Sequence, residues 1–249
     1  MVTDRDSIKF REEFNLETIG ELLMKRFNEV HYPVHVWVIR PCKYMNDKFV
    51  VYKGFLPMNN DGIPSFGKAC FNTDFKNISA IPHLQALLNN ACQIGNAKLG
   101  PIYGNVCNPN LPCTMIGFSK GTVILTKIFF EIHLEIMKNT ISPFVFLINE
   151  MYWLDAGHNG EEDYWPHDYQ IFNRIASCRS LRGITFHAYA TPFQIGRPIK
   201  LKSYQEFSQL TEILLKMGVQ HTSGYLLRGD EINLKTHFDI IKAFPIRHH

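Results

Sequence analysis

The sequence predicts an α/β protein whose mostly parallel sheet carries helices on both faces. Apolar runs of strand length alternate along the chain with stretches of helical periodicity, an alternation typical of βαβ units. A serine flanked by glycines stands between one such strand and the helix that follows it. The length of 249 residues suits one large domain, so we expect residues 1–249 to form a single unit.

The first part of the chain is expected to hold two helices and one strand. Residues 16–30 carry apolar side chains at helical spacing, and Asn15 precedes them as an N-cap. The valine-rich run 35–39 is closed by Arg40-Pro41, as expected of a short strand. The other expected features are an ambiguous aromatic-rich stretch at 44–55, a loop at 58–67, a helix at 83–91 and a surface loop at 95–112.

The second part of the chain alternates regularly between strands and helices. Expected strands lie at 114–117, 144–154, 183–190 and 225–227, and expected helices lie at 119–138, 168–178, 204–217 and 236–244. Gly218 is the expected C-cap of the third of these helices, and a glycine-rich loop follows the second strand at 155–160. In sheets of this kind, the chemistry sits at the carboxyl ends of the strands.

The pentapeptide Gly117-Phe118-Ser119-Lys120-Gly121 has the form G-x-S-x-G and joins a strand to a helix. This layout predicts a nucleophile elbow, a tight turn that exposes the serine hydroxyl. Small flanking residues are needed because strand and helix pack closely around the turn. The backbone N–H of Lys120 would then face a developing oxyanion. The alternative is an ordinary βα turn whose serine caps the helix.

A nucleophilic serine needs a base, and that base needs a carboxylate to orient it. In α/β-hydrolases the order along the chain is serine, acid, histidine, and Ser119, Asp155 and His237 follow that order. Asp155 directly follows a strand, and we expect His237 in a loop just before the last helix.

Several alternatives to this triad stay open. Asp155 could instead stabilise its own glycine-rich turn, and His158 could be its partner. His187 lies inside an apolar strand, where a buried, hydrogen-bonded role is expected. His237 could be an ordinary exposed residue near a helix start, because the chain has 11 histidines.

Composition and motifs argue against several other classes of protein. The formal charge of +3 comes from scattered Lys and Arg, so we expect no nucleic-acid partner. The six irregularly spaced cysteines favour a reducing compartment, with pairing of Cys107 and Cys113 as the alternative. No apolar run reaches the roughly 18 residues of a membrane span. We expect no metal and no cofactor, because neither H-E-x-x-H nor a phosphate-binding glycine loop occurs.

Four segments, together with the valine-rich run and Arg-Pro ending at 35–41, resemble one known family, that of chromosome 2 open reading frame sixty-nine proteins. The four segments are Phe118-Ser119-Lys120-Gly121, Met151-Tyr152-Trp153-Leu154-Asp155 with Gly157-His158, Thr191-Pro192-Phe193-Gln194, and Thr236-His237-Phe238. The resemblance runs from about residue 16 to residue 244. It implies an α/β-hydrolase-like fold, a serine-hydrolase triad at Ser119, Asp155 and His237, a mitochondrial setting and no established substrate.

The chain departs from the family's pattern at its start. Family members have an upstream strand and a Phe-Pro-Gly-Asp type loop, which in the hydrolase template supplies the second oxyanion donor. Residues 1–14 contain neither, so we expect a sheet lacking the N-terminal strands.

Two functions therefore stay open. The first is a serine hydrolase acting on a small acyl or lipid-like substrate, with residues 58–75 and 95–113 as the rim of its pocket. The second is an inactive hydrolase-like scaffold that binds a protein or a lipid. The family implies a mitochondrial location, whereas the lack of a visible presequence leaves a cytoplasmic one as the alternative.

Overall fold

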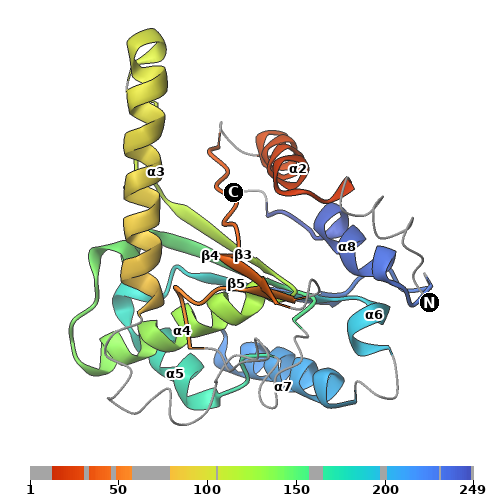
Figure 1. Cartoon of the computed structure of the whole chain (residues 1–249). Helices are drawn as coiled ribbons and strands as arrows, with labels where there is room; N and C mark the ends of the chain where they lie inside the picture. The colour runs from red at the N-terminus through yellow and green to blue at the C-terminus, as the bar shows by residue number, and fades with distance from the viewer. Residues whose placement is uncertain are drawn as a thin grey trace.

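The computed structural model describes residues 13–30, 34–45, 49–57, 79–104, 106–156, 165–196, 201–229 and 231–247. Four of its strands form a parallel sheet in the order β3-β4-β5-β6 (Figure 1). These strands are β3 (Cys113–Phe118), β4 (Ile148–Leu154), β5 (Thr185–Ala190) and β6 (His221–Tyr225). An antiparallel pair, β1 (Lys43–Met45) and β2 (Phe49–Val51), stands apart from this sheet.

Helices connect and cover the strands. They are α2 (Leu16–Asn28), α3 (Ala80–Tyr103), α4 (Gly121–Met137), α5 (Tyr169–Ser177), α6 (Pro192–Ile195), α7 (Leu201–Met217) and α8 (Leu234–Ala243), with short 3-10 turns η2 (Pro143–Leu147) and η3 (Arg179–Leu181). Figure 1 shows α4, α5 and α7 on one face of the sheet and α2 and α8 on the other. The expected α/β class, the parallel sheet and the helices on both faces are therefore confirmed.

Two hydrophobic cores lie on opposite faces of the sheet. Strand side chains alternate between the faces, so Met151 and Trp153 enter the core under α4, α5 and α7. Tyr152 and Leu154 enter the second core, which α2 and α8 close with Phe27 and Ile240 among others. The central strands β4 and β5 are buried on both sides, which explains their nearly continuous apolar sequences.

Several expected elements differ from the structure. Residues 34–40 belong to no described strand, and Trp37 and Ile39 are exposed. The last strand covers residues 221–225 rather than 225–227, and β4 begins at Ile148 because a 3-10 turn precedes it. The loop expected at 58–67 lies outside the described residues.

The largest difference is α3, which continues to Tyr103 through residues that were expected to form a loop. This part of the helix needs a glycine at position 95, because a Cβ there would lie 2.9 Å from the sulfur of Cys107 on the returning chain. Cys107 and Cys113 are both free thiols, so the alternative disulfide between them is wrong.

Within the described part of the chain, no helix has both the length and the apolarity needed to cross a membrane.

Candidate active site

The parallel register brings three strand ends to one edge of the sheet. Phe118 is paired with Leu154, and Leu154 with Tyr189, so the residues that follow these strands are neighbours. The ladder continues one step further, because the Ser119 N–H donates to the Leu154 carbonyl at 3.0 Å and the Asp155 N–H donates to the Tyr189 carbonyl at 2.9 Å. Ser119 and Asp155 therefore leave adjacent strands at the same level.

Ser119 has the backbone geometry of a sharp turn. Its φ is 51°, in the left-handed region that non-glycine residues rarely adopt. A Cβ at Gly117 would lie 2.8 Å from the Cα of Thr122, so strand and helix approach too closely there for any side chain. The Thr122 hydroxyl donates to the Ser119 carbonyl at 2.6 Å and holds the turn from its far side. Strain of this kind persists only where the surroundings enforce it.

Gly121 has a different environment from the other flanking glycine. A Cβ built there meets no atom within 4 Å. The expectation that both flanking positions must be small is therefore correct for Gly117 and wrong for Gly121.

Asp155 is fully buried, and three donors surround its carboxylate. The Thr191 N–H donates to one oxygen at 2.6 Å, and the Thr191 hydroxyl donates to the other at 2.6 Å. The Nδ1 atom of His237 lies 2.8 Å from the second oxygen. A buried carboxylate needs such partners to offset the loss of water. The φ of Asp155, 48°, adds a second strained position at this edge.

His237 lies in the first turn of α8, not in a loop before it. Asn233 caps this helix by accepting a hydrogen bond from the Thr236 N–H at 3.0 Å. The imidazole is buried among aromatic rings, with centroid distances of 4.7 Å to Phe118 and 4.8 Å to Phe193. The alternative of an exposed, ordinary histidine is therefore wrong. The rings hold His237 beside the residue that precedes Ser119.

Lys120 occupies the N-cap position of α4, in right-handed helical conformation. Its side chain is half-buried rather than fully solvated, and burial lowers the pKa of its ammonium group below the ordinary value. The helix start that follows it carries the positive end of the α4 dipole, which favours negative charge nearby.

The other candidate residues lie elsewhere or have other partners. His187 is buried in β5, where its Nδ1 lies 2.7 Å from the Thr222 hydroxyl, as expected of a core histidine. His158 lies outside the described residues. Among the residues that the structure describes, no group of three His, Cys, Asp or Glu side chains is placed to hold a metal ion.

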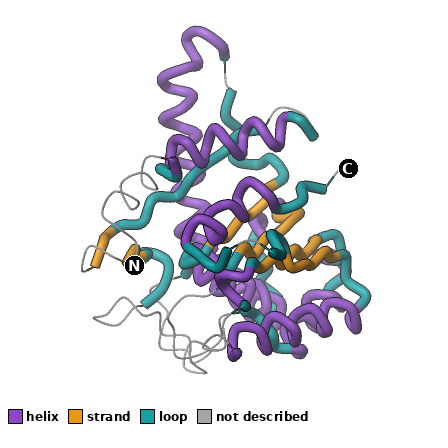
Figure 2. Tube along the Cα trace, turned by 90° about the vertical axis from the view of Figure 1, so that its right-hand side faces the viewer, coloured by secondary structure: helices purple, strands orange, loops and turns teal. Residues whose placement is uncertain are grey.

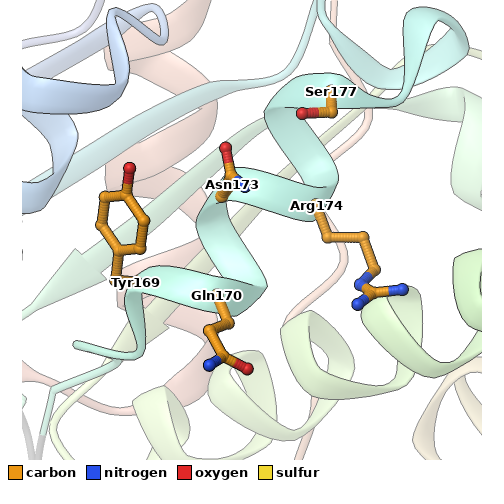
Figure 3. Close-up of a pocket in the computed structure, with 5 residues that line it drawn as sticks. All are labelled: Tyr169, Gln170, Asn173, Arg174 and Ser177. Carbon is orange, nitrogen blue, oxygen red and sulfur yellow. The ribbon is translucent and has the colours of Figure 1, made fainter.

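A shallow pocket of about 330 Å³ lies on α5 (Figure 3). All five lining residues belong to that helix, namely Tyr169, Gln170, Asn173, Arg174 and Ser177. None of them touches the carboxylate–imidazole pair, so we do not assign this pocket to the candidate site.

Thr191 and Phe193 are site residues that sequence reasoning missed. The segment Thr191-Pro192 reads as the end of a strand, and proline has no N–H to donate. Leu227 was expected in a strand, but it lies just after β6 and has a φ of 55°.

Comparison with known proteins gives one family. A family model described as C2orf69 matches residues 1–99 and 105–220, a stretch that includes Ser119 and Asp155 but ends before His237. The mitochondrial protein C2orf69 homolog of Danio rerio is 28% identical over 237 residues, which cover 93% of this chain and 65% of that protein.

Two mammalian proteins give similar values. The homolog of Mus musculus is 27% identical over 94% of this chain and 71% of its own length. The mitochondrial protein C2orf69 of Homo sapiens is 27% identical over 94% of this chain and 67% of its own length. The chain thus spans about two thirds of the length of these relatives. No solved structure matches it.

Proposed function

The chain belongs to the C2orf69 family, and from that premise we propose that it is a serine hydrolase of the α/β-hydrolase type. The observation that carries the proposal is the buried Asp155–His237 contact of 2.8 Å beside a left-handed Ser119. The strand order supports it as well, because serine, acid and histidine follow β3, β4 and β6 in turn.

In the proposed reaction, Ser119 attacks the acyl carbon of an ester, thioester or amide. Asp155 accepts a hydrogen bond from Nδ1 of His237, which leaves Nε2 as the base that takes the serine proton. The protonated imidazole then gives that proton to the leaving group, which departs and leaves the acyl group on Ser119. His237 next takes a proton from a water molecule that attacks this acyl-enzyme, and it returns the proton to Ser119 as the acid is released. The Lys120 backbone N–H donates to the oxyanion, and the two bonds from Thr191 keep the carboxylate fixed.

The surroundings of His237 favour an apolar acyl or lipid-like substrate. Phe118, Phe193 and Phe238 are only partly buried, although their rings pack around the imidazole. Phe193 is the partly exposed residue within α6, whose other three residues are buried. The names of the relatives support a mitochondrial location for this chain.

Labelling by a fluorophosphonate probe with intact-mass readout tests the proposal, because such probes react with activated serines. We expect one label per chain and none in Ser119→Ala. Asp155→Asn and His237→Gln should slow labelling on the order of a thousandfold or more, since triad members act as a unit. Ser223→Ala, at an exposed serine of β6, is the matched control and should label like the parent.

A folded chain that takes no label would contradict the proposal. It would favour the alternative of a hydrolase-like scaffold that binds a partner without chemistry. Labelling that survives in Ser119→Ala would equally exclude Ser119 as the nucleophile.

A further inference from the structure

Helix α3 projects from the body of the molecule, and both views show its distal end standing clear of the other elements (Figures 1 and 2). The helix contains 24 residues, so it is about 36 Å long at 1.5 Å per residue. Its base packs on α4 and η2. Further along the helix, the chain returning to β3 lies beside it, where Cys107 contacts Gly95 and Asn96.

The base of α3 is firmly held. The carboxylate of Glu131 on α4 accepts hydrogen bonds from the N–H groups of Ala80 and Ile81 at 2.8 and 2.9 Å, and from the Ser79 hydroxyl at 2.9 Å. A carboxylate at a helix N-terminus is also favoured by the helix dipole. The projection is therefore anchored to a buried helix of the domain.

The tip of the projection is apolar. From Ala97 to Gly104, every residue except Gly100 is exposed. Ile102 and Tyr103 are 72% and 70% exposed, and Leu99 is 43% exposed. Leu111, on the returning chain, is 47% exposed. Clustered exposure of large apolar side chains marks an interaction surface.

Charge is almost missing from this region. Residues 80–112 contain one charged side chain, Lys98, and neither Asp nor Glu. Lys98 is itself exposed, next to Leu99 and one turn before Ile102. A surface with one cation and no anion suits contact with anionic headgroups, because nothing on it is repelled by them.

The backbone beside the tip is already hydrogen-bonded. The side-chain amide of Asn96 donates to the Cys107 carbonyl at 2.8 Å and accepts from the Cys107 N–H at 2.8 Å. The Gly104 N–H closes the helix on the Gly100 carbonyl at 2.9 Å. These bonds lower the cost of removing the region from water.

We propose that the tip of α3, formed by Leu99, Ile102 and Tyr103 with Lys98 beside them, inserts into the headgroup region of an anionic lipid membrane. A protein interface is a broad patch with a polar rim and regular hydrogen bonding, whereas the end of α3 is narrow and, from Ala97 to Gly104, exposes just two polar side chains, those of Lys98 and Tyr103. Aliphatic side chains beside a tyrosine and a lysine are the combination that interfacial membrane anchors use. The helix does not cross the bilayer in this arrangement.

Flotation of the whole chain with vesicles tests the inference. Vesicles of phosphatidylcholine containing phosphatidylglycerol should carry the parent chain to the top of the gradient. The double variant Ile102→Ser, Tyr103→Ser should lose binding on the order of tenfold or more, because two exposed apolar side chains are replaced. Lys98→Gln should weaken binding to these vesicles about fivefold, the effect of one basic residue near an anionic surface.

Leu215→Ser is the matched control, because Leu215 is 69% exposed on α7, away from α3. It should bind vesicles like the parent. A second readout uses Tyr103→Trp, whose fluorescence should shift to the blue with vesicles and be quenched by brominated lipid. The added emission of Leu215→Trp should stay unchanged.

Three outcomes would overturn the inference. The parent chain could fail to float with the vesicles, or the double variant could float equally well. The third is concentration-dependent self-association that the double variant abolishes while neither chain binds lipid, which would make the tip a contact between copies of this chain. None of these outcomes bears on labelling of Ser119.

Discussion

Gly117 and Gly121 flank Ser119 symmetrically in the sequence but have different surroundings. Gly117→Ala should lower the free energy of unfolding by about 1–3 kcal/mol, because its Cβ would lie 2.8 Å from a backbone atom of the helix that must stay in place. Gly121→Ala should be neutral or should raise it by about 0.5–1 kcal/mol, because the space is open and alanine favours a helix.

Urea unfolding of the two variants measures this difference. Fluorophosphonate labelling reports the turn itself, and it should slow in Gly117→Ala alone. Equal destabilisation by both substitutions would contradict the close packing of β3 against α4.

The residues of the site differ in how far the sequence reveals them. The turn at Ser119 is local, because five consecutive residues contain the glycine, the serine and the start of the helix. The pair Asp155 and His237 is separated by 82 positions, so only the alternation of strands and helices brought these residues together in the prediction. Thr191 could not be assigned, because its role depends on the register of β4 and β5.

Arg26 joins α2 to the end of α8, the helix that carries His237. Its guanidinium donates to the Ile241 carbonyl at 2.7 Å and to the Phe244 carbonyl, and it lies 4.4 Å from the centre of the Phe244 ring. Burial lowers the pKa of this group. Arg26→Ala should cost about 1.5–3 kcal/mol of unfolding free energy, because charged donors to two carbonyls are lost.

Chemical denaturation measures this loss, and Lys25→Ala, at the exposed neighbour in the last turn of α2, is the control. Arg26→Lys should recover only part of the stability, since an ammonium cannot reproduce the planar fork. If Arg26→Ala proved as stable as Lys25→Ala, the contacts of Arg26 with the end of α8 would contribute nothing to the free energy of unfolding.

At the scale of elements, periodicity predicted helices better than strands. Residues 16–30 and 204–217 show a clear apolar stripe, and α2 and α7 lie there within a few residues. The run 35–39 has the composition of a strand, but a strand also requires a partner, and composition does not show one. The helix predicted at 83–91 ended too early, because glycine, asparagine and proline usually mark loops. In the structure α3 continues through these residues, and Gly95 leaves room for the returning chain.

At the scale of the whole molecule, the parallel sheet separates two hydrophobic cores, and a number of polar side chains are buried beside them. One of them is His133, buried on α4, with no hydrogen-bond partner for its Nδ1 atom among the described residues. Burial lowers the pKa of this imidazole, Arg174 lowers it further, and Asp168 raises it. The folded protein therefore holds His133 neutral at pH values where the unfolded chain begins to bind a proton.

This difference predicts how the stability of the molecule depends on pH. Below about pH 6.5, the ordinary pKa of histidine, the unfolded state binds more protons than the folded state, so the free energy of unfolding should fall as the pH falls. His133→Leu removes the proton site without leaving an unpaired polar atom, and its stability should fall less steeply between pH 7 and pH 5.5. Urea unfolding across this range gives both curves. Their separation should be constant above the histidine range, where neither state is protonated, and should change only below it. Parallel curves throughout would show that His133 takes up its proton as readily in the folded protein as in the unfolded chain.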